Sequence, residues 1–567
     1  MPVPVIVLNF GHSVLRSLED YTEAASEIYR HYRQGRNVVA VTSAQGDQTD
    51  VLMAEARRIG PEGIAQNLPE LIQLGERKSA ALLALALERT GASAFVRQAR
   101  DIGLQARGPH TQAELVDLNV AQLQEDLKNH DIVVMPGFVG IGKNDRPSLL
   151  GDGGADYTAL YVAQRLNAPA LLLKDVDGVY ESDPKDADDS PGRYQTISWT
   201  EARQRTDVLI SPKALNFAED KGVEFFIGRP GIPFYTRVGA VMGAPSTSPV
   251  PRKLRVAMMG CGVVGGGVYR RIMANPDRFD LVSILVRNPQ KYINQGYPAD
   301  RVTTDYDACV AARPDIFIDV SGPVEPALTY IRDMLDRGVH IVSANKQAIA
   351  EGGRDLLKRA GDRDVMLAFS SAAGGGMPIL EMCRREKGRI VRIEALLNGT
   401  TNYMIDEICN GKTYAEALEA AQEKGFAEAD PSNDVSGRDA AAKIRLLARL
   451  AFDIDVGFDR IPCDTIENFN PPEANKCVIK RVSVCHDHAH GFDASVELRN
   501  LCPDDFLAGA RGEEARATVY FTDGDAYRIR GKGAGRWPTT EAVMADLYDI
   551  SERVAFRTCN LKASPVL

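Results

Sequence analysis

A short segment of this chain, residues 428–443, concentrates side chains that could hold a small zwitterion and move a proton. It contains Glu428, Asp430, Asp434, Asp439 and Lys443. Pro431, Asn433 and Gly437 predict a loop over its first half. Ser436 and Asp439 have the spacing of a capping box, which predicts that a helix follows. On that helix Asp439 and Lys443 would share one face. The alternative interpretation is a surface helix with an ordinary ion pair.

The bulk properties of the chain limit its partners and its compartment. Its 567 residues predict three or four domains. The net charge of −10 argues against nucleic acid and against an acidic membrane surface as partners. Nine scattered cysteines without a CxxC pair favour free thiols in a reducing compartment. No apolar run is long enough for a membrane span and no signal peptide is evident, so we expect a cytoplasmic protein.

Strands and helices alternate in the first part of the chain, which predicts an α/β sandwich. We expect strands at 3–8, 37–41, 132–135, 170–173 and 224–227. The loops at 43–50, 74–79, 134–140 and 150–184 resemble those of the amino-acid kinase family, specifically aspartokinase. This resemblance implies an amino-acid-kinase-like α/β/α sandwich over residues 1–238.

The kinase-like part departs from the aspartokinase pattern where the chemistry would occur. The lysine that faces the transferring phosphate in the family is Asn9 here, and a glycine is replaced by His12. Asp152 stands where the family's arginine resembles a clamp for the substrate carboxylate, and a serine is Ala155. Loss of phosphate-facing cations predicts a catalytically silent domain. Four family acids remain, so nucleotide binding without turnover stays open beside a purely structural role: Glu76, Asp156, Asp175 and Asp177.

A dinucleotide-binding unit is predicted after a Pro/Ser/Gly-rich linker at 239–252. A strand at 254–259 runs into Gly260, Gly262 and Gly265, and a helix is expected from about residue 268. This order lets a pyrophosphate lie on a helix N-terminus. Arg287, with Lys291 nearby, ends the next strand where an NAD enzyme usually carries an acid, which favours the 2′-phosphate of NADP. The alternative is that Arg287 is only a solvated strand end. The Rossmann domain is expected over 253–385.

Several further motifs resemble homoserine dehydrogenase and occur in the order of that family. They are residues 325–327, 343–346, 375–378, 397–403, 426–431, 434–443 and 531–535. The resemblance implies an α+β catalytic and dimerisation domain at 386–545 and a C-terminal helix, 546–567, that returns to the nucleotide domain. A homodimer or higher homo-oligomer is implied, and the short linker leaves no room for the regulatory domains of fused aspartokinase–homoserine dehydrogenases.

The resemblance also implies the chemistry, which is hydride transfer between NAD(P)H and aspartate 4-semialdehyde to give homoserine. Lys443 and Lys346 would supply the proton and stabilise the oxyanion, and Asp439 would orient Lys443. The substrate would be held by Glu428, Asp434, Gly399 and Thr400. The cofactor would contact Gly260, Gly262, Val263, Val264, Gly265, Arg287, Lys291, Ser321, Ala344, Lys346 and Gly535.

The family's monovalent-cation site is altered. The glutamate that resembles a cation ligand is Ser370 here, so carbonyl oxygens of Ala373 and Gly375 would form at most a weak sodium site. Three alternatives stay open for the whole chain: an active bifunctional aspartokinase–homoserine dehydrogenase, a dehydrogenase for a related amino-acid aldehyde, and a non-catalytic scaffold.

Overall fold

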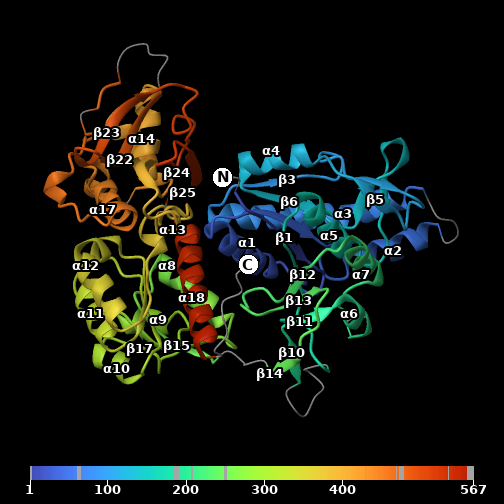
Figure 1. Cartoon of the computed structure of the whole chain (residues 1–567). Helices are drawn as coiled ribbons and strands as arrows, with labels where there is room; N and C mark the ends of the chain where they lie inside the picture. Colours follow the sequence, from blue (N-terminus) through green and yellow to red (C-terminus); the bar gives the residue numbers. More distant parts are fainter. Residues whose placement is uncertain are drawn as a thin grey trace. The chain divides into compact units, whose positions relative to one another are not determined.

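The computed structural model describes residues 3–60, 66–182, 191–205, 209–247, 252–427, 430–467, 469–471, 478–533 and 535–558. The chain forms two compact units, and Figure 1 labels their elements. The first unit comprises Met1–Val250 with Phe556–Leu567, and the second comprises Pro251–Ala555. No helix in the described part of the chain is long and apolar enough to cross a membrane.

The first unit is built on an eight-stranded sheet of order β11-β13-β12-β9-β1-β2-β6-β3. All neighbours pair in parallel except β12 and β13. The strands are β1 (Val5–Phe10), β2 (Asn37–Thr42), β3 (Ala94–Val96), β6 (Ile132–Pro136), β9 (Ala170–Leu173), β11 (Thr196–Ser198), β12 (Phe225–Gly228) and β13 (Tyr235–Gly239). The predicted α/β pattern is confirmed, and the apolar runs of β1, β2 and β9 are buried on both faces, as covered parallel strands require.

Helices cover both faces of this sheet. They are α1 (Asp20–Arg33), α2 (Gln48–Ile59), α3 (Leu68–Thr90), α4 (Val120–His130), α5 (Gly154–Leu166), α6 (Trp199–Arg205) and α7 (Pro212–Lys221). Val7 and Val39 pack in one core with α4, α5 and α7. Because side chains alternate along a strand, Ile6 and Val38 face the other way, where α1 and α3 pack together.

Two smaller sheets complete the first unit. A four-stranded sheet contains β4 (Gln105–Arg107), β5 (Glu114–Asp117), β7 (Val139–Ile141) and β8 (Pro147–Leu149). β10 (Gly192–Tyr194) pairs antiparallel with β14 (Pro245–Thr247). Part of the segment predicted as a linker is therefore a strand of the first unit.

The second unit begins with a six-stranded, wholly parallel sheet of order β17-β16-β15-β18-β19-β20. Its strands are β15 (Leu254–Met259), β16 (Phe279–Leu285), β17 (Val302–Thr303), β18 (Ile316–Asp319), β19 (His340–Ser343) and β20 (Leu367–Ala368). This is the predicted Rossmann-like architecture.

Two helical layers enclose this sheet. They contain α8 (Val263–Met273), α9 (Pro289–Ile293), α10 (Tyr306–Ala311), α11 (Ala327–Asp336), α12 (Lys346–Asp362) and α18 (Arg536–Thr558). Val256 packs with α8 and α18, whereas its neighbour Ala257 packs with α11 and α12. Helix α8 starts at Val263, so the expectation of a helix from about residue 268 is wrong by five residues, and Gly265 lies inside the helix.

An antiparallel sheet of order β23-β22-β21-β24-β25 follows. Its strands are β21 (Ile390–Leu396), β22 (Val478–His488), β23 (Gly491–Leu501), β24 (Glu514–Phe521) and β25 (Ala526–Lys532). The helices of this part are α13 (Ile379–Arg385), α14 (Gly399–Cys409), α15 (Tyr414–Glu423), α16 (Ser432–Val435) and α17 (Arg438–Phe452). Helix α17 packs against α12, α13 and β22, so it joins the two sheets of the unit.

Candidate active site

Helix α17 begins directly after Gly437, which has a φ of 85°. The capping box predicted for Ser436 and Asp439 is wrong. Ser436 follows the last residue of α16. Among the described residues its hydroxyl has no hydrogen-bond partner and no side chain caps α17. The helix itself was expected correctly, because its period places Asp439 and Lys443 on one buried face.

Asp439 bridges two lysines. Its Oδ2 lies 2.8 Å from Lys443 Nζ, one turn along α17, and its Oδ1 forms an ion pair with Lys346 Nζ, at the start of α12. The Lys443 side chain is 7% exposed and that of Lys346 is 38% exposed. Lys443 Nζ also donates to the Leu397 carbonyl oxygen at 2.5 Å. An ammonium has three N–H donors, so the third one of Lys443 remains for a ligand.

Asn398 ties the acidic loop to this cluster. Its Nδ2 donates to Asp434 Oδ1 at 2.6 Å and to Asp439 Oδ2 at 2.9 Å. Its Oδ1 accepts from the backbone of Thr401 and thereby caps α14. The structure therefore brings together Lys346, Lys443, Asp439 and Asp434, which the sequence separates by up to 97 positions.

For Asp439 and Lys443, burial and the charge of the partner shift the pKa in opposite directions. Burial acts to raise the pKa of the Asp439 carboxyl, but Lys443 and Lys346 hold that pKa below its ordinary value. Burial lowers the pKa of the Lys443 ammonium, although Asp439 opposes the shift. Burial and the nearby charge of Asp439 raise the pKa of Asp434. A lysine with a lowered pKa is suited to proton transfer near neutral pH.

The remaining predicted substrate residues flank this cluster. Gly399 and Thr400 form the first turn of α14, directly after Asn398. The Thr400 hydroxyl donates to the Phe426 carbonyl oxygen at 2.5 Å and so holds the segment that leads into the acidic loop. Glu428 lies outside the described residues.

Arg481 supports the acidic loop, and the sequence analysis missed it. Its guanidinium donates to the carbonyl oxygens of Asp434 and Val435 and to the Thr401 hydroxyl. Burial lowers its pKa to about 10. The available signal was a Lys-Arg pair inside the apolar strand β22, where buried cations need partners.

A cavity of about 590 Å³ lies at the carboxyl edge of the parallel sheet. Its lining includes five predicted cofactor residues: Gly260, Gly262, Arg287, Lys291 and Ser321. Val263, Val264, Gly265, Ala344, Lys346 and Gly535 are not part of that lining. Residues that were not predicted also line it, among them Asn288, Tyr292, Thr304 and Tyr330.

The glycine loop has the shape that a dinucleotide needs. A Cβ at Gly260 would lie 2.8 Å from the Val320 carbonyl oxygen, and one at Gly265 would lie 2.6 Å from that of Gly260. A Cβ at Gly262 would meet nothing within 4 Å, so this backbone is open on the side of the cavity. The residues therefore fit a dinucleotide on the N-terminus of α8.

The lysine-bearing loop is tied to the wall of this cavity. Asn345 caps α12 immediately before Lys346, and its Nδ2 donates to the carbonyl oxygen of Pro323 at 2.8 Å. Pro323 belongs to the cavity lining. This hydrogen bond thus ties the segment that carries Lys346 to the loop that follows β18 in the cavity wall.

Ser370, which replaces the family's glutamate, is hydrogen-bonded to another acidic side chain. The Ser370 backbone N–H and hydroxyl donate to the two carboxylate oxygens of Asp546, at 2.9 and 2.6 Å. Ala373 and Gly375 lie nearby in sequence and are buried. No group of three potential metal-binding side chains occurs among the described residues. Position 370 itself supplies no carboxylate ligand, and its serine instead binds the carboxylate of Asp546.

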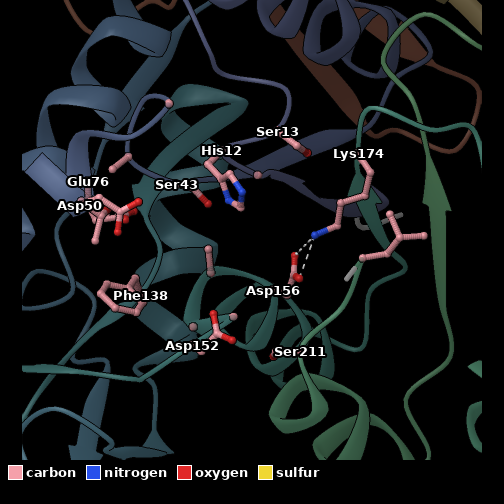
Figure 2. A pocket seen from close by; sticks show the side chains of 18 of the residues that line it. His12, Ser13, Ser43, Asp50, Glu76, Phe138, Asp152, Asp156, Lys174 and Ser211 are labelled. Carbon is pink, nitrogen blue, oxygen red and sulfur yellow. Dashed lines mark hydrogen bonds and ion pairs between the residues drawn. The ribbon is translucent and has the colours of Figure 1, made fainter. Parts of the chain in front are cut away.

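The first unit has a cavity of its own, of about 580 Å³ (Figure 2). His12, Asp152 and Ala155 line it, so three of the four departures from the aspartokinase pattern face one cavity. Glu76, Asp156 and Asp175 also line it, whereas Asp177 instead accepts a hydrogen bond from Tyr180. Asn9 is fully buried and donates to Asp156 Oδ1 at 2.5 Å.

Three family models match the chain. Residues 4–228 match the amino acid kinase family, residues 260–369 match the NAD binding domain of homoserine dehydrogenase, and residues 378–548 match homoserine dehydrogenase.

Relatives and solved structures point to the same family. The homoserine dehydrogenase of Pseudomonas aeruginosa is 30% identical over 53% of this chain and 72% of its own length. That of Synechocystis is 32% identical over 55% of this chain and 77% of its own length. The crystal structure of a homoserine dehydrogenase from Thiobacillus denitrificans superposes with a TM-score of 0.50 and 27% identity, covering 56% of this chain and 80% of that one.

Proposed function

Since the chain belongs to the homoserine dehydrogenase family, we propose that its second unit interconverts aspartate 4-semialdehyde and homoserine with NADP, and that its kinase-like unit is catalytically silent. The observation that carries the first part is the pair of lysines held on one buried carboxylate, Asp439. The chain is an oxidoreductase, and an amino-acid kinase domain precedes its dehydrogenase domains in the sequence.

A nicotinamide dinucleotide, when bound, supplies or accepts the hydride. Gly260 and Gly262 would hold its pyrophosphate, and Ser321 lines the same cavity. Arg287 and Lys291 would hold the 2′-phosphate, because both line that cavity and both are cationic. This pair of cations supports NADP over NAD.

Lys443 and Lys346 act on the substrate oxygen. During reduction the aldehyde oxygen gains negative charge and must receive a proton. Lys443 gives that proton, because burial weakens its hold on it, and Lys346 stabilises the oxyanion from the more exposed side of Asp439. In the reverse direction Lys443 accepts the proton of the homoserine hydroxyl. Asp439 holds the ammonium groups of Lys443 and Lys346 close to the same substrate oxygen.

The acidic loop holds the amino-acid end of the substrate. Asp434 attracts the substrate ammonium, and Arg481 fixes the backbone of Asp434 from behind. The backbone N–H groups at Gly399 and Thr400, in the first turn of α14, face the substrate carboxylate.

Among the residues that the structure describes, the cavity of the kinase-like unit is poor in cations. Lys174 is the one lysine or arginine in this described lining, and its Nζ lies 2.8 Å from both oxygens of Asp156. Asp152 adds negative charge where the transferring phosphate and an acidic substrate would have to approach.

Two assays on the purified chain test the proposed function. NADPH oxidation should depend on aspartate 4-semialdehyde, and ATP should not be consumed with aspartate. A rate that is higher with a related amino-acid aldehyde would reassign the substrate, and aspartate-dependent ATP consumption would show that the first unit is an active kinase.

Replacing Arg287 by aspartate should separate the two cofactors. The KM for NADPH should rise about tenfold or more, because a charge-assisted contact to phosphate is lost, while the KM for NADH should not rise. Arg363→Asp, an exposed position outside the cavity lining, is the matched control. An equal loss with both cofactors would remove Arg287 from 2′-phosphate recognition.

The dehydrogenase rate should not depend on sodium. Replacing about 0.1 M choline chloride by sodium chloride at constant ionic strength should change kcat/KM less than about twofold, because Ser370 provides no carboxylate ligand. A steep, saturable rise of the rate with sodium would contradict this.

A further inference from the structure

The cavity of the first unit has acidic walls. Side chains from α2, α3 and the start of α5 line it together with the loops that follow β1, β2, β6 and β9. Its ionisable lining residues, apart from His12, are Asp50, Glu76, Asp152, Asp156, Asp175 and Lys174. Of the residues that the structure describes, five with a carboxyl group and one with an ammonium group therefore line this space.

The one ammonium is already neutralised. Lys174 donates to both carboxylate oxygens of Asp156, and Asn9 donates to the same carboxylate. Figure 2 shows this pair on the opposite side of the cavity from Asp50 and Glu76. Within the described part of the chain, Asp50 and Asp152 have no ion-pair partner. The remaining wall is thus anionic, which disfavours phosphates and carboxylates.

Glu76 points to a ligand that donates hydrogen bonds. Glu76 is only 3% exposed, and its Oε2 atom has no hydrogen-bond partner among the described residues. Burial raises the pKa of this carboxyl to about 8, although the Ala44 backbone N–H opposes the shift. Leaving a buried acceptor unpaired is costly, and a hydrogen-bond donor entering the cavity would relieve that cost.

Phe138 adds an aromatic surface to the same wall. It has a φ of 66°, a left-handed conformation that is strained for a bulky residue, and its ring packs where a Cβ on Gly154 would otherwise lie. In Figure 2 its ring is seen below Asp50 and Glu76 and to the left of Asp152. Aromatic faces attract ammonium groups.

An organic cation fits these walls better than a metal ion. The described residues contain no group of three side chains close enough to hold a metal. The volume of about 580 Å³ accommodates a small molecule. We propose that this cavity binds a small alkyl diamine or a similar organic cation without phosphate, with its ammonium groups held by Glu76, Asp50 and Asp152. This inference does not depend on the dehydrogenase chemistry of the second unit.

Calorimetric titration of the full chain with putrescine tests the proposal. Putrescine should bind saturably, and added salt should weaken it. Asp152→Asn and Glu76→Gln should each raise the Kd about tenfold, which corresponds to the loss of one charge-assisted hydrogen bond. Glu125→Gln, an exposed acid on α4 outside the cavity, should leave the Kd unchanged. Asp152 is exposed, so its replacement does not endanger folding.

Three outcomes would overturn the proposal. The first is that no putrescine binding is detected up to about 10 mM, a concentration far above the Kd range of specific small-molecule sites. The second is an equal Kd for putrescine in wild type, Asp152→Asn and Glu76→Gln. The third is tighter binding of Mg·ATP or L-aspartate than of putrescine. Dehydrogenase assays of the same samples report separately on the proposed function, so the two can fail independently.

Discussion

Replacing Lys443 by methionine should lower kcat for aspartate 4-semialdehyde reduction by about a thousandfold, because the aldehyde oxygen loses its proton donor. Methionine keeps much of the volume of the lysine stem, so packing of the buried face of α17 should be retained. NADPH oxidation under saturating substrate measures the change.

The matched control is Lys358→Met. Lys358 and Asp362 form an ion pair with the same four-residue spacing on α12, but both are exposed, at 76% and 59%. Exposed pairs contribute little, so this variant should keep kcat within about twofold. An unchanged rate in Lys443→Met would remove Lys443 from the mechanism.

Replacing Asp439 by asparagine should lower kcat about a hundredfold or more and shift the pH profile. The negative charge of Asp439 raises the pKa of Lys443 against the effect of burial. Without that charge the pKa of Lys443 falls further. Reduction needs the protonated lysine, so the rate is lost as the pH rises through this pKa, and the alkaline limb should move to lower pH.

The same substitution should also destabilise the fold. It leaves two ammonium groups without their carboxylate, and breaking a buried pair costs roughly 3–5 kcal/mol. Rates must therefore be referred to the folded fraction, measured by thermal unfolding. Asp362→Asn provides the exposed control. An alkaline limb that stays in place in Asp439→Asn would show that Lys443 is not the titrating donor.

The sequence predicted those parts of the site that depend on local periodicity. The strand before Gly260 and the helix after it follow from apolar runs and glycine spacing, and helical period alone places Asp439 beside Lys443. The helix boundaries were less predictable. The capping box predicted for Ser436 is wrong because Gly437, with its positive φ, directly precedes α17, and because the Asp439 carboxylate binds the two lysines instead.

Contacts between distant segments could not be read from spacing. Lys346 reaches Asp439 because α12 packs on α17, and this packing depends on the whole core of the second unit. Arg481 reaches the acidic loop from β22 for the same reason. The pairing of Asn9 with Asp156 likewise depends on how β1 lies against α5.

A double-mutant comparison of Lys346→Met and Lys443→Met tests most directly whether two ammonium groups act together on one substrate oxygen. If they do, the kcat of the double variant should be about as low as that of the more damaged single variant, because groups that act as a unit are not additive. Losses that multiply would show that the two lysines work independently, and would contradict a shared site on Asp439.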